Sequence, residues 1–465
     1  MACRRCAPSR RFPLELDVPP QLLVHAARAV VDGREASVSV TVREGKITQI
    51  EPLTSATLAR PAGQVVTLGP DEVLIPGLVD AHVHVNEPGR THWEGFETAT
   101  RAAAAGGVTT IVDMPLNSLP PTVDVPALVT KQDAARHRVA VDVAFWGGAI
   151  PGNLGELAGL HEAGVMGFKC FMADSGVPEF PPVDDAQLAA VLAEAARLDA
   201  LVVVHAEDPH VLLGSPPAAG RRFADFLASR PPTAENDAVA RLLGHAAATG
   251  ARVHVLHLAS GEAVPQLAAA QADGVRVTAE TCPHYLTLDA DTVPDGATAF
   301  KCCPPIRGRE HQDALWQALA DGVLTCVVSD HSPCVPELKA LDSGDFGAAW
   351  GGIASVQLGL AAVWTAARAR GVPLADVVTW MSARPADLAG LPAKGRIAVG
   401  ADADLAVLVP DGTLVVDPAT LHHRNPVTPY AGLELTGVVR STWLRGEQIR
   451  LDGPPAGRLL RRGER

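Results

Sequence analysis

His82 and His84 stand two residues apart in the segment from Asp80 to Arg90, with one valine between them and another after. Residues i and i+2 of a β-strand share a face, so on a strand both imidazoles would point to the same side. Two imidazoles placed in this way can hold one divalent transition metal ion. Packed or surface histidines would show the same spacing, so the pair alone does not establish a metal site.

Three more polar residues stand at or near the ends of short apolar runs. His205, His257 and Asp330 each occupy such a position in a segment rich in Val and Leu. If these runs are the strands of a parallel barrel, their carboxyl ends face one shared pocket, where the catalytic groups of such barrels lie. Four histidines and one carboxylate match the ligand chemistry of a divalent transition metal. Packing alone would explain one such residue, but it is a poor explanation for five.

Lys169 lies in an apolar run from Val165 to Met172, where burial of an ammonium group is unfavourable. A lysine ammonium beside two metal cations would also be repelled. Carbamylated by CO₂, the same side chain becomes an anion with two oxygens that can bridge two ions. The alternative is a buried lysine paired with an acid such as Asp113, which the nearby histidines make less favourable.

Short strand-like runs alternate with alanine-rich helical stretches along most of the chain. Eight such alternations are what a parallel (β/α)₈ barrel requires. The predicted barrel strands are Val73 to Val85, Val108 to Met114, Val141 to Gly147, Val165 to Phe171, Leu201 to Ala206, Arg252 to Ala259, Val275 to Glu280 and Leu324 to Ser329.

The two ends of the chain show the alternating pattern of half-exposed strands. The sequence therefore predicts an α/β fold in which a TIM barrel over residues 71–395 carries a small β-sandwich-like domain. Residues 21–70 and 396–450 would form that domain together. Residues 1–20 are expected to be a disordered tail, and residues 451–465 a C-terminal tail.

The composition is that of a globular protein, and the net charge of −13 argues against nucleic acid or an anionic membrane as partner. No apolar run reaches the ~18 residues of a membrane span. The eight cysteines show no disulfide framework, so we expect reduced thiols and a cytoplasmic protein. Cys3 and Cys6 lack the second pair that a zinc site needs.

Several segments resemble the cyclic amidohydrolases, the group that includes dihydroorotase, dihydropyrimidinase and allantoinase. The resemblance runs from about residue 22 to residue 450 and is closest to the allantoinases. It is carried by residues 80–96, 106–121, 167–172, 280–285, 301–307 and 329–334.

The resemblance implies a binuclear metal centre in which the ions are most often zinc, with cobalt, manganese and iron as alternatives. His82, His84 and Asp330 would hold one ion, His205 and His257 the second, and carbamylated Lys169 would bridge them. Asp330 would also be the catalytic residue, taking a proton from the attacking water and passing it to the leaving nitrogen. His254 does not fit this set and is expected to pack nearby or contact a ligand. The ligands implied are His82, His84, Lys169, His205, His257 and Asp330.

Two departures from the relatives favour a ureide ring as substrate. Dihydroorotase-like enzymes have an arginine where this chain has Asn86, and dihydropyrimidinase-like enzymes have a tyrosine where it has Asp174. The expected substrate is allantoin, and the resemblance implies that the enzyme is a homotetramer. The alternatives are a hydrolase of another hydantoin or cyclic ureide, and a non-catalytic scaffold with the same fold. The expected substrate contacts are Asn86, Asn117, Ser332 and Cys303.

Overall fold

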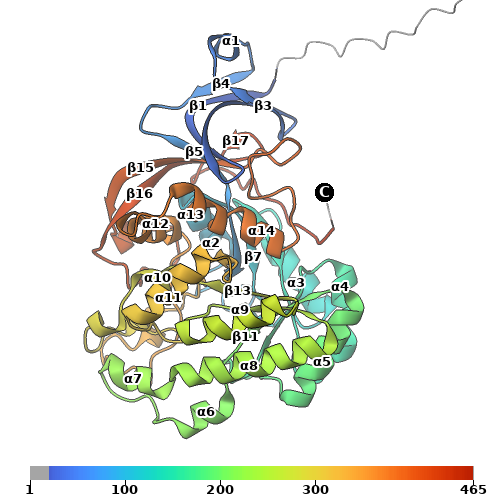
Figure 1. Ribbon diagram of the computed structural model, residues 1–465, viewed down its shortest axis with the longest axis vertical. Helices are drawn as coiled ribbons and strands as arrows, with labels where there is room; N and C mark the ends of the chain where they lie inside the picture. The colour runs from blue at the N-terminus through green and yellow to red at the C-terminus, as the bar shows by residue number, and fades with distance from the viewer. Residues whose placement is uncertain (1–19, 464–465) are drawn as a thin grey trace, which may run out of the picture.

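The computed structural model describes residues 20–463. A (β/α)₈ barrel forms the larger part, and a β-sheet that contains strands from both ends of the chain lies against one end of it (Figure 1). The predicted fold class is therefore confirmed.

The barrel strands are parallel and follow one another in chain order. The last strand meets the first through a bridge between Val83 and His331, and the His84 amide donates to the His331 carbonyl at 2.8 Å. The strands are β6 (Leu78–Val83), β7 (Val108–Asp113), β8 (Asp142–Phe145) with its continuation β9 (Gly147–Gly148), β10 (Phe168–Phe171), β11 (Leu201–His205), β12 (Arg252–Val255), β13 (Val277–Thr281) and β14 (Cys326–Val327).

Helices surround these strands, and local signals in the sequence fix several of their starts. Before α5, Asp184 and Gln187 form a capping box, each side chain bonded to the other residue's backbone amide, at 2.8 and 2.9 Å. The helices are α2 (Phe96–Ala105), α3 (Val125–Ala135), α4 (Leu157–Ala163), α5 (Asp185–Leu198), α6 (Pro209–Gly214), α7 (Phe223–Ser229), α8 (Pro232–Thr249), α9 (Val264–Ala272), α10 (Pro283–Thr287), α11 (Arg309–Ala320), α12 (Gly359–Ala369), α13 (Leu374–Met381) and α14 (Ala383–Leu388).

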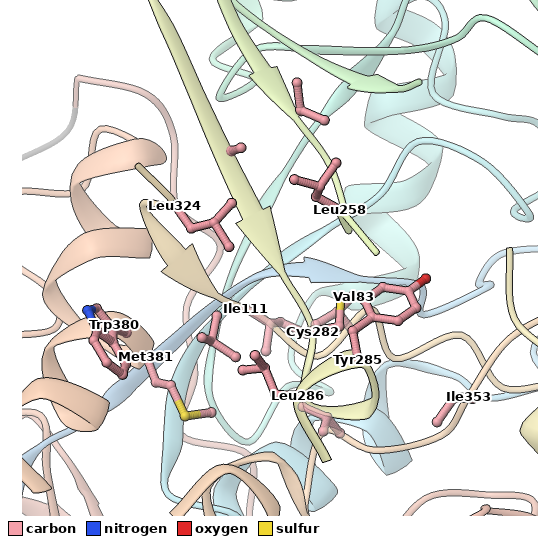
Figure 2. Close-up of a cluster of buried hydrophobic side chains, with 14 of the residues drawn as sticks. Val83, Ile111, Leu258, Cys282, Tyr285, Leu286, Leu324, Ile353, Trp380 and Met381 are labelled. Atoms are coloured by element: carbon pink, nitrogen blue, oxygen red, sulfur yellow. The ribbon is translucent and has the colours of Figure 1, made fainter. Parts of the chain in front are cut away.

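Side chains alternate between the two faces of each strand, so one face packs in the core and the other points into the barrel. On β11, Val202 and Val204 belong to the large cluster that packs beneath the helices, whereas Val203 belongs to a second, smaller cluster. His205 shares the face of Val203, because residues two apart on a strand point the same way. Figure 2 shows part of the large cluster, where Trp380 and Met381 of α13 approach the barrel strands. On β11, one face thus packs against the helices, and the other carries apolar Val203 and then His205 at the end of the strand.

The second sheet joins the two ends of the chain in the order β17-β16-β15-β5-β1-β2-β3, with β4 paired to β1. The predicted strand from Val73 to Val85 is in fact two strands, because β5 pairs with β15 in this sheet before β6 enters the barrel. The elements are β1 (Leu22–Val31), β2 (Arg34–Arg43), β3 (Lys46–Pro52), α1 (Ser55–Leu58), β4 (Gln64–Thr67), β5 (Val73–Pro76), β15 (Leu405–Val415), β16 (Glu434–Leu444) and β17 (Glu447–Gln448).

The segment after β17 returns to the barrel. The Gly457 amide donates to the Val139 carbonyl at 2.9 Å, and Leu459 forms a parallel bridge with Val143 of β8. Throughout residues 20–463, no helix is long and apolar enough to cross a membrane. The six cysteines in that range are free, and Cys3 and Cys6 lie outside the described residues.

Candidate metal centre

The carboxyl ends of the barrel strands bring the predicted ligands together in the interior. All six of them are buried, with Lys169 only 1% exposed and Asp330 7% exposed. Lys169 lies on β10 and His205 closes β11, while Asp330 follows β14. These are the ends of the strands at which barrels of this kind place their reactive groups.

His82, His84 and Asp330 form the tightest group. The Asp330 Oδ1 atom lies 3.1 Å from His82 Nε2 and 3.5 Å from His84 Nε2, and one donor atom from each residue falls within 4.8 Å of the others. Burial lowers the pKa of His84 to about 3. Burial opposes ionisation of Asp330, but His82 and His84 hold its pKa well below its usual range. A neutral imidazole and an ionised carboxylate are the forms that bind metal ions.

His205 and His257 form a second pair on the neighbouring strands. His205 Nδ1 lies 2.9 Å from His257 Nε2, and the other ring nitrogen of His257 has no hydrogen-bond partner. Burial, followed by the nearby His205, lowers the pKa of His257 well below its usual value. Two buried nitrogen atoms that face each other without a shared carboxylate are a donor set suited to a divalent transition metal.

Lys169 lies beside the first group, with its Nζ atom 3.4 Å from His82 Nε2. Burial lowers its pKa to about 8. The pairing with Asp113 considered from the sequence does not occur, because Asp113 binds Lys131 instead, with Lys131 Nζ 2.7 Å from Asp113 Oδ2. The amine is therefore buried, free of a salt bridge to Asp113, and closer to its neutral form than an exposed lysine.

Two buried carboxylates that the sequence did not single out orient the histidines. Glu280 Oε1 lies 2.6 Å from His82 Nδ1, and Glu207 Oε2 lies 2.7 Å from His205 Nε2. Burial raises the pKa of each carboxyl, but His82 and His254 bring the pKa of Glu280 well below its usual range, and Arg230 and His205 do the same for Glu207. An ionised carboxylate can only accept, so His82 donates through Nδ1 and His205 through Nε2, and the other ring nitrogen of each histidine is the one turned toward the proposed metal site.

A second geometric group combines His254, Glu280 and Cys326, all buried within the barrel. His254 Nε2 lies 3.0 Å from Glu280 Oε2, and its Nδ1 lies 2.7 Å from Thr278 Oγ1. Burial raises the pKa of the Cys326 thiol well above its usual value, which disfavours the thiolate that a metal would need. His254 thus contacts the carboxylate that holds His82, in the kind of position expected from the sequence.

Four residues around the centre have left-handed backbone conformations. The φ angles are +66° at Asn86 and Asn117, +36° at His257 and +45° at Asp330. Asn, Asp and His enter this region more readily than other residues with a side chain, and such strain concentrates at functional sites. The residue types at these four positions therefore tolerate the left-handed backbone and also place polar side chains around the candidate metal site.

A cavity of about 750 Å³ opens above the centre. Asn117, Ser332 and Cys303 line it, whereas Asn86 does not, since its Nδ2 donates to the Pro333 carbonyl at 3.1 Å. The cavity wall also includes residues that were not among the substrate contacts expected from the sequence. These are Phe171, Phe226, Arg230, Lys301 and Trp350.

Residues 73–449 match the sequence model of the Amidohydrolase family. The chain belongs to this family. An allantoinase from Streptomyces avermitilis is 58% identical over 446 residues, which cover 95% of this chain and 99% of that protein. An allantoinase from Saccharomyces cerevisiae is 47% identical over 382 residues, covering 81% of this chain and 82% of that protein. The resemblance to amidohydrolases expected from the sequence is confirmed.

Solved structures of other amidohydrolases share the whole fold. The L-hydantoinase (dihydropyrimidinase) from Arthrobacter aurescens superposes with a TM-score of 0.89 at 31% identity, covering 95% of this chain and all of that one. The dihydropyrimidinase from Brevibacillus agri NCHU1002 gives a TM-score of 0.84 at 30% identity, covering 95% and 98%. The barrel and the terminal sheet are therefore common to this chain and to these two enzymes.

Proposed function

We propose that this amidohydrolase is an allantoinase, which hydrolyses the ring amide of allantoin to give allantoate. The observation that carries the proposal is the 58% identity to the Streptomyces avermitilis allantoinase over nearly the whole of both chains. The hydantoinases with the same fold are only about 30% identical to this chain. Sequence similarity thus favours allantoin where the fold alone would not choose among cyclic amides.

The wall of the cavity supports the same choice. Asp174 lines the cavity at the position where dihydropyrimidinase-like enzymes have a tyrosine. The chain has only two tyrosines, both buried, and the Tyr285 hydroxyl donates to the Pro304 carbonyl at 2.7 Å. Neither is among the residues that line the cavity. A phenol that assists ring opening is therefore not part of this site.

The donor set fits two divalent metal ions, most simply zinc. We propose that His82, His84 and Asp330 hold one ion, that His205 and His257 hold the other, and that carbamylated Lys169 contacts both. A bound metal pair supplies an activated water and polarises the carbonyl group of the substrate. Cobalt, manganese and iron suit the same ligands.

The protein's own groups then act on protons and on the position of the ring. Asp330 accepts the proton of the attacking water and delivers it to the ring nitrogen as the C–N bond breaks. Asn117 and Ser332 offer an amide and a hydroxyl at the cavity wall for the N–H and C=O groups of a ureide. Cys303 also lines the cavity, and Asn86 supports this wall through its contact with Pro333.

A hydantoin with another substituent is the second candidate, because the solved structures with this fold are hydantoinases. A non-catalytic scaffold is the least favoured, since all six ligands are present and buried. We further propose a cytoplasmic enzyme, consistent with the six free cysteines among residues 20–463, and a homotetramer, which the resemblance to this group of enzymes implies.

The deciding experiment measures ring opening of racemic allantoin, dihydroorotate, dihydrouracil and hydantoin, with a metal count on the same preparation. We expect allantoin to be the best substrate by kcat/KM and about two metal ions per chain. Two ions with faster turnover of hydantoin would keep the mechanism and replace the substrate. A metal-loaded preparation that opens none of these rings would overturn the proposal.

A further inference from the structure

Arg230 and Glu207 form an ion pair directly behind His205, in which Glu207 is buried and the Arg230 side chain is 21% exposed and lines the cavity. Arg230 Nε lies 3.0 Å from Glu207 Oε1, and Arg230 Nη2 lies 2.6 Å from Glu207 Oε2. This two-point contact fixes the plane of the carboxylate as well as its position. Glu207 is completely buried, so Arg230 provides its charge compensation.

The same carboxylate determines how His205 is presented. Glu207 Oε2 lies 2.7 Å from His205 Nε2, which must donate, because the ionised carboxylate has no proton to give. The remaining nitrogen, Nδ1, then carries the lone pair and faces His257 Nε2 at 2.9 Å. The ring also stacks on Phe171 at 4.7 Å between centroids, which limits its rotation.

Arg230 comes from a different part of the chain and is itself held in place. It follows α7, and its carbonyl accepts from Arg307 Nη1 at 3.2 Å. Arg307 in turn forms a buried ion pair with Glu235, whose Oε1 also accepts from the Ala259 amide just after His257. One set of contacts thus ties the loop that holds Arg230 to the segment that holds His257.

We propose that Arg230, acting through Glu207, is a positioning residue that makes Nδ1 the metal-binding atom of His205. The inference rests on the proposed assignment of His205 and His257 to the second ion. Without Arg230, Glu207 would lack its counter-charge and its fixed plane. His205 would then no longer be restricted to the tautomer and orientation that aim Nδ1 at the partner nitrogen of His257.

The test compares Arg230→Met and Glu207→Gln with wild type for metal content and metal affinity. We expect both variants to keep the ion held by His82, His84 and Asp330. We expect the second ion to bind ~10 to 100-fold more weakly, as when the outer partner of a metal-binding histidine is removed. Chelator competition measures the affinity, and the visible spectrum of the cobalt-loaded protein reports the ligands of each ion.

Arg222→Met is the matched control, because Arg222 stands just before the same helix and pairs with the half-exposed Asp225, away from His205. We expect it to bind both ions like wild type, and Arg230→Lys to recover part of the lost affinity by restoring the charge. Wild-type affinity for both ions and an unchanged cobalt spectrum in Arg230→Met would overturn the inference while leaving the proposed function intact. Wild-type protein that binds fewer than two ions would instead contradict the proposed metal centre.

If Arg230→Met does not fold, Arg230→Lys and Glu207→Gln still decide the matter. Glu207→Gln keeps the shape of the side chain but offers an amide that can donate to His205 Nε2, which places the proton on Nδ1. Selective loss of the second ion in that variant supports the inference. Equal loss of both ions, or of neither, contradicts it.

Discussion

Asp330 combines an ionised carboxylate with a left-handed backbone, at φ = +45°. Asn is among the few side chains that tolerate this conformation, so Asp330→Asn should fold normally. The amide cannot accept and return a proton, and we expect kcat to fall by about 10²- to 10⁴-fold. Circular dichroism checks the fold, and turnover at saturating metal measures kcat. Asp313→Asn, at an exposed side chain of α11, is the control. A near-normal kcat would remove Asp330 from proton transfer.

Lys169 is the residue whose proposed role depends on a modification. Its pKa is lowered to about 8 by burial, which raises the fraction of neutral amine that can react with CO₂. We expect Lys169→Ala to bind little metal and to retain little activity. Acetate or propionate at high concentration should restore part of both, because a small carboxylate can replace the carbamate oxygens. Lys46→Ala, on the terminal sheet, is the control.

Full activity of Lys169→Ala without an added acid would contradict the bridging role. Loss of both metal and activity, with no recovery in any carboxylate, would indicate that the alanine variant has lost its structure at β10. A melting curve of the metal-free protein would show that loss directly.

The elements of the barrel were predictable because most of the strands are short runs rich in Val, Ile or Leu that alternate with alanine-rich helical stretches. The same signal could not separate β5 from β6, since both are apolar and only Gly77 stands between them. The histidines were found by their place at strand ends. Glu280 was not, because it meets His82 across 198 residues of sequence, and a buried acid has no local pattern that distinguishes it from an exposed one.

Gly167 allows β10 to approach β11 closely enough to present Lys169. A Cβ atom at residue 167 would lie 2.4 Å from the Leu201 carbonyl oxygen and 2.9 Å from the Trp146 ring. We therefore expect Gly167→Ala to destabilise the protein by about 1–3 kcal/mol, because backbone must shift. Gly244→Ala on exposed α8, where nothing lies within 4 Å, is the matched control and should be stabilising by ~0.5–1 kcal/mol.

Thermal unfolding of the metal-free forms at one scan rate compares the two glycine variants. A melting temperature of Gly167→Ala equal to that of Gly244→Ala would show that β10 can move without loss, contrary to the close contact with Leu201.

At the scale of the whole molecule, one buried charge network joins the terminal sheet to the barrel. Lys394 Nζ lies 2.6 Å from Asp142 Oδ2 on β8 and 2.7 Å from Asp404 Oδ2 just before β15. Lys394 Nζ also lies 2.8 Å from Asp402 Oδ2, and Arg445 forms a second ion pair with Asp142. Burial lowers the pKa of Lys394, but the three carboxylates outweigh it and raise the pKa above its usual value. The network holds the base of the barrel against the strands from the C-terminal part of the chain.

Lys394→Met should destabilise the protein by about 3–5 kcal/mol at neutral pH, since it leaves buried carboxylates without their cation. The pKa of Asp404 is already raised by burial and by Asp142, and loss of Lys394 should raise it further. An acid whose folded pKa is raised loses stability as pH rises above its unfolded pKa of about 3.9. The deficit in melting temperature against wild type should therefore be large at pH 7.5 and smaller at pH 4.5.

Lys46→Met, which removes only a partly exposed contact to Asp402, should show little deficit at either pH. If the deficit in melting temperature of Lys394→Met is the same at both pH values, the loss of stability comes from lost packing and not from uncompensated charge.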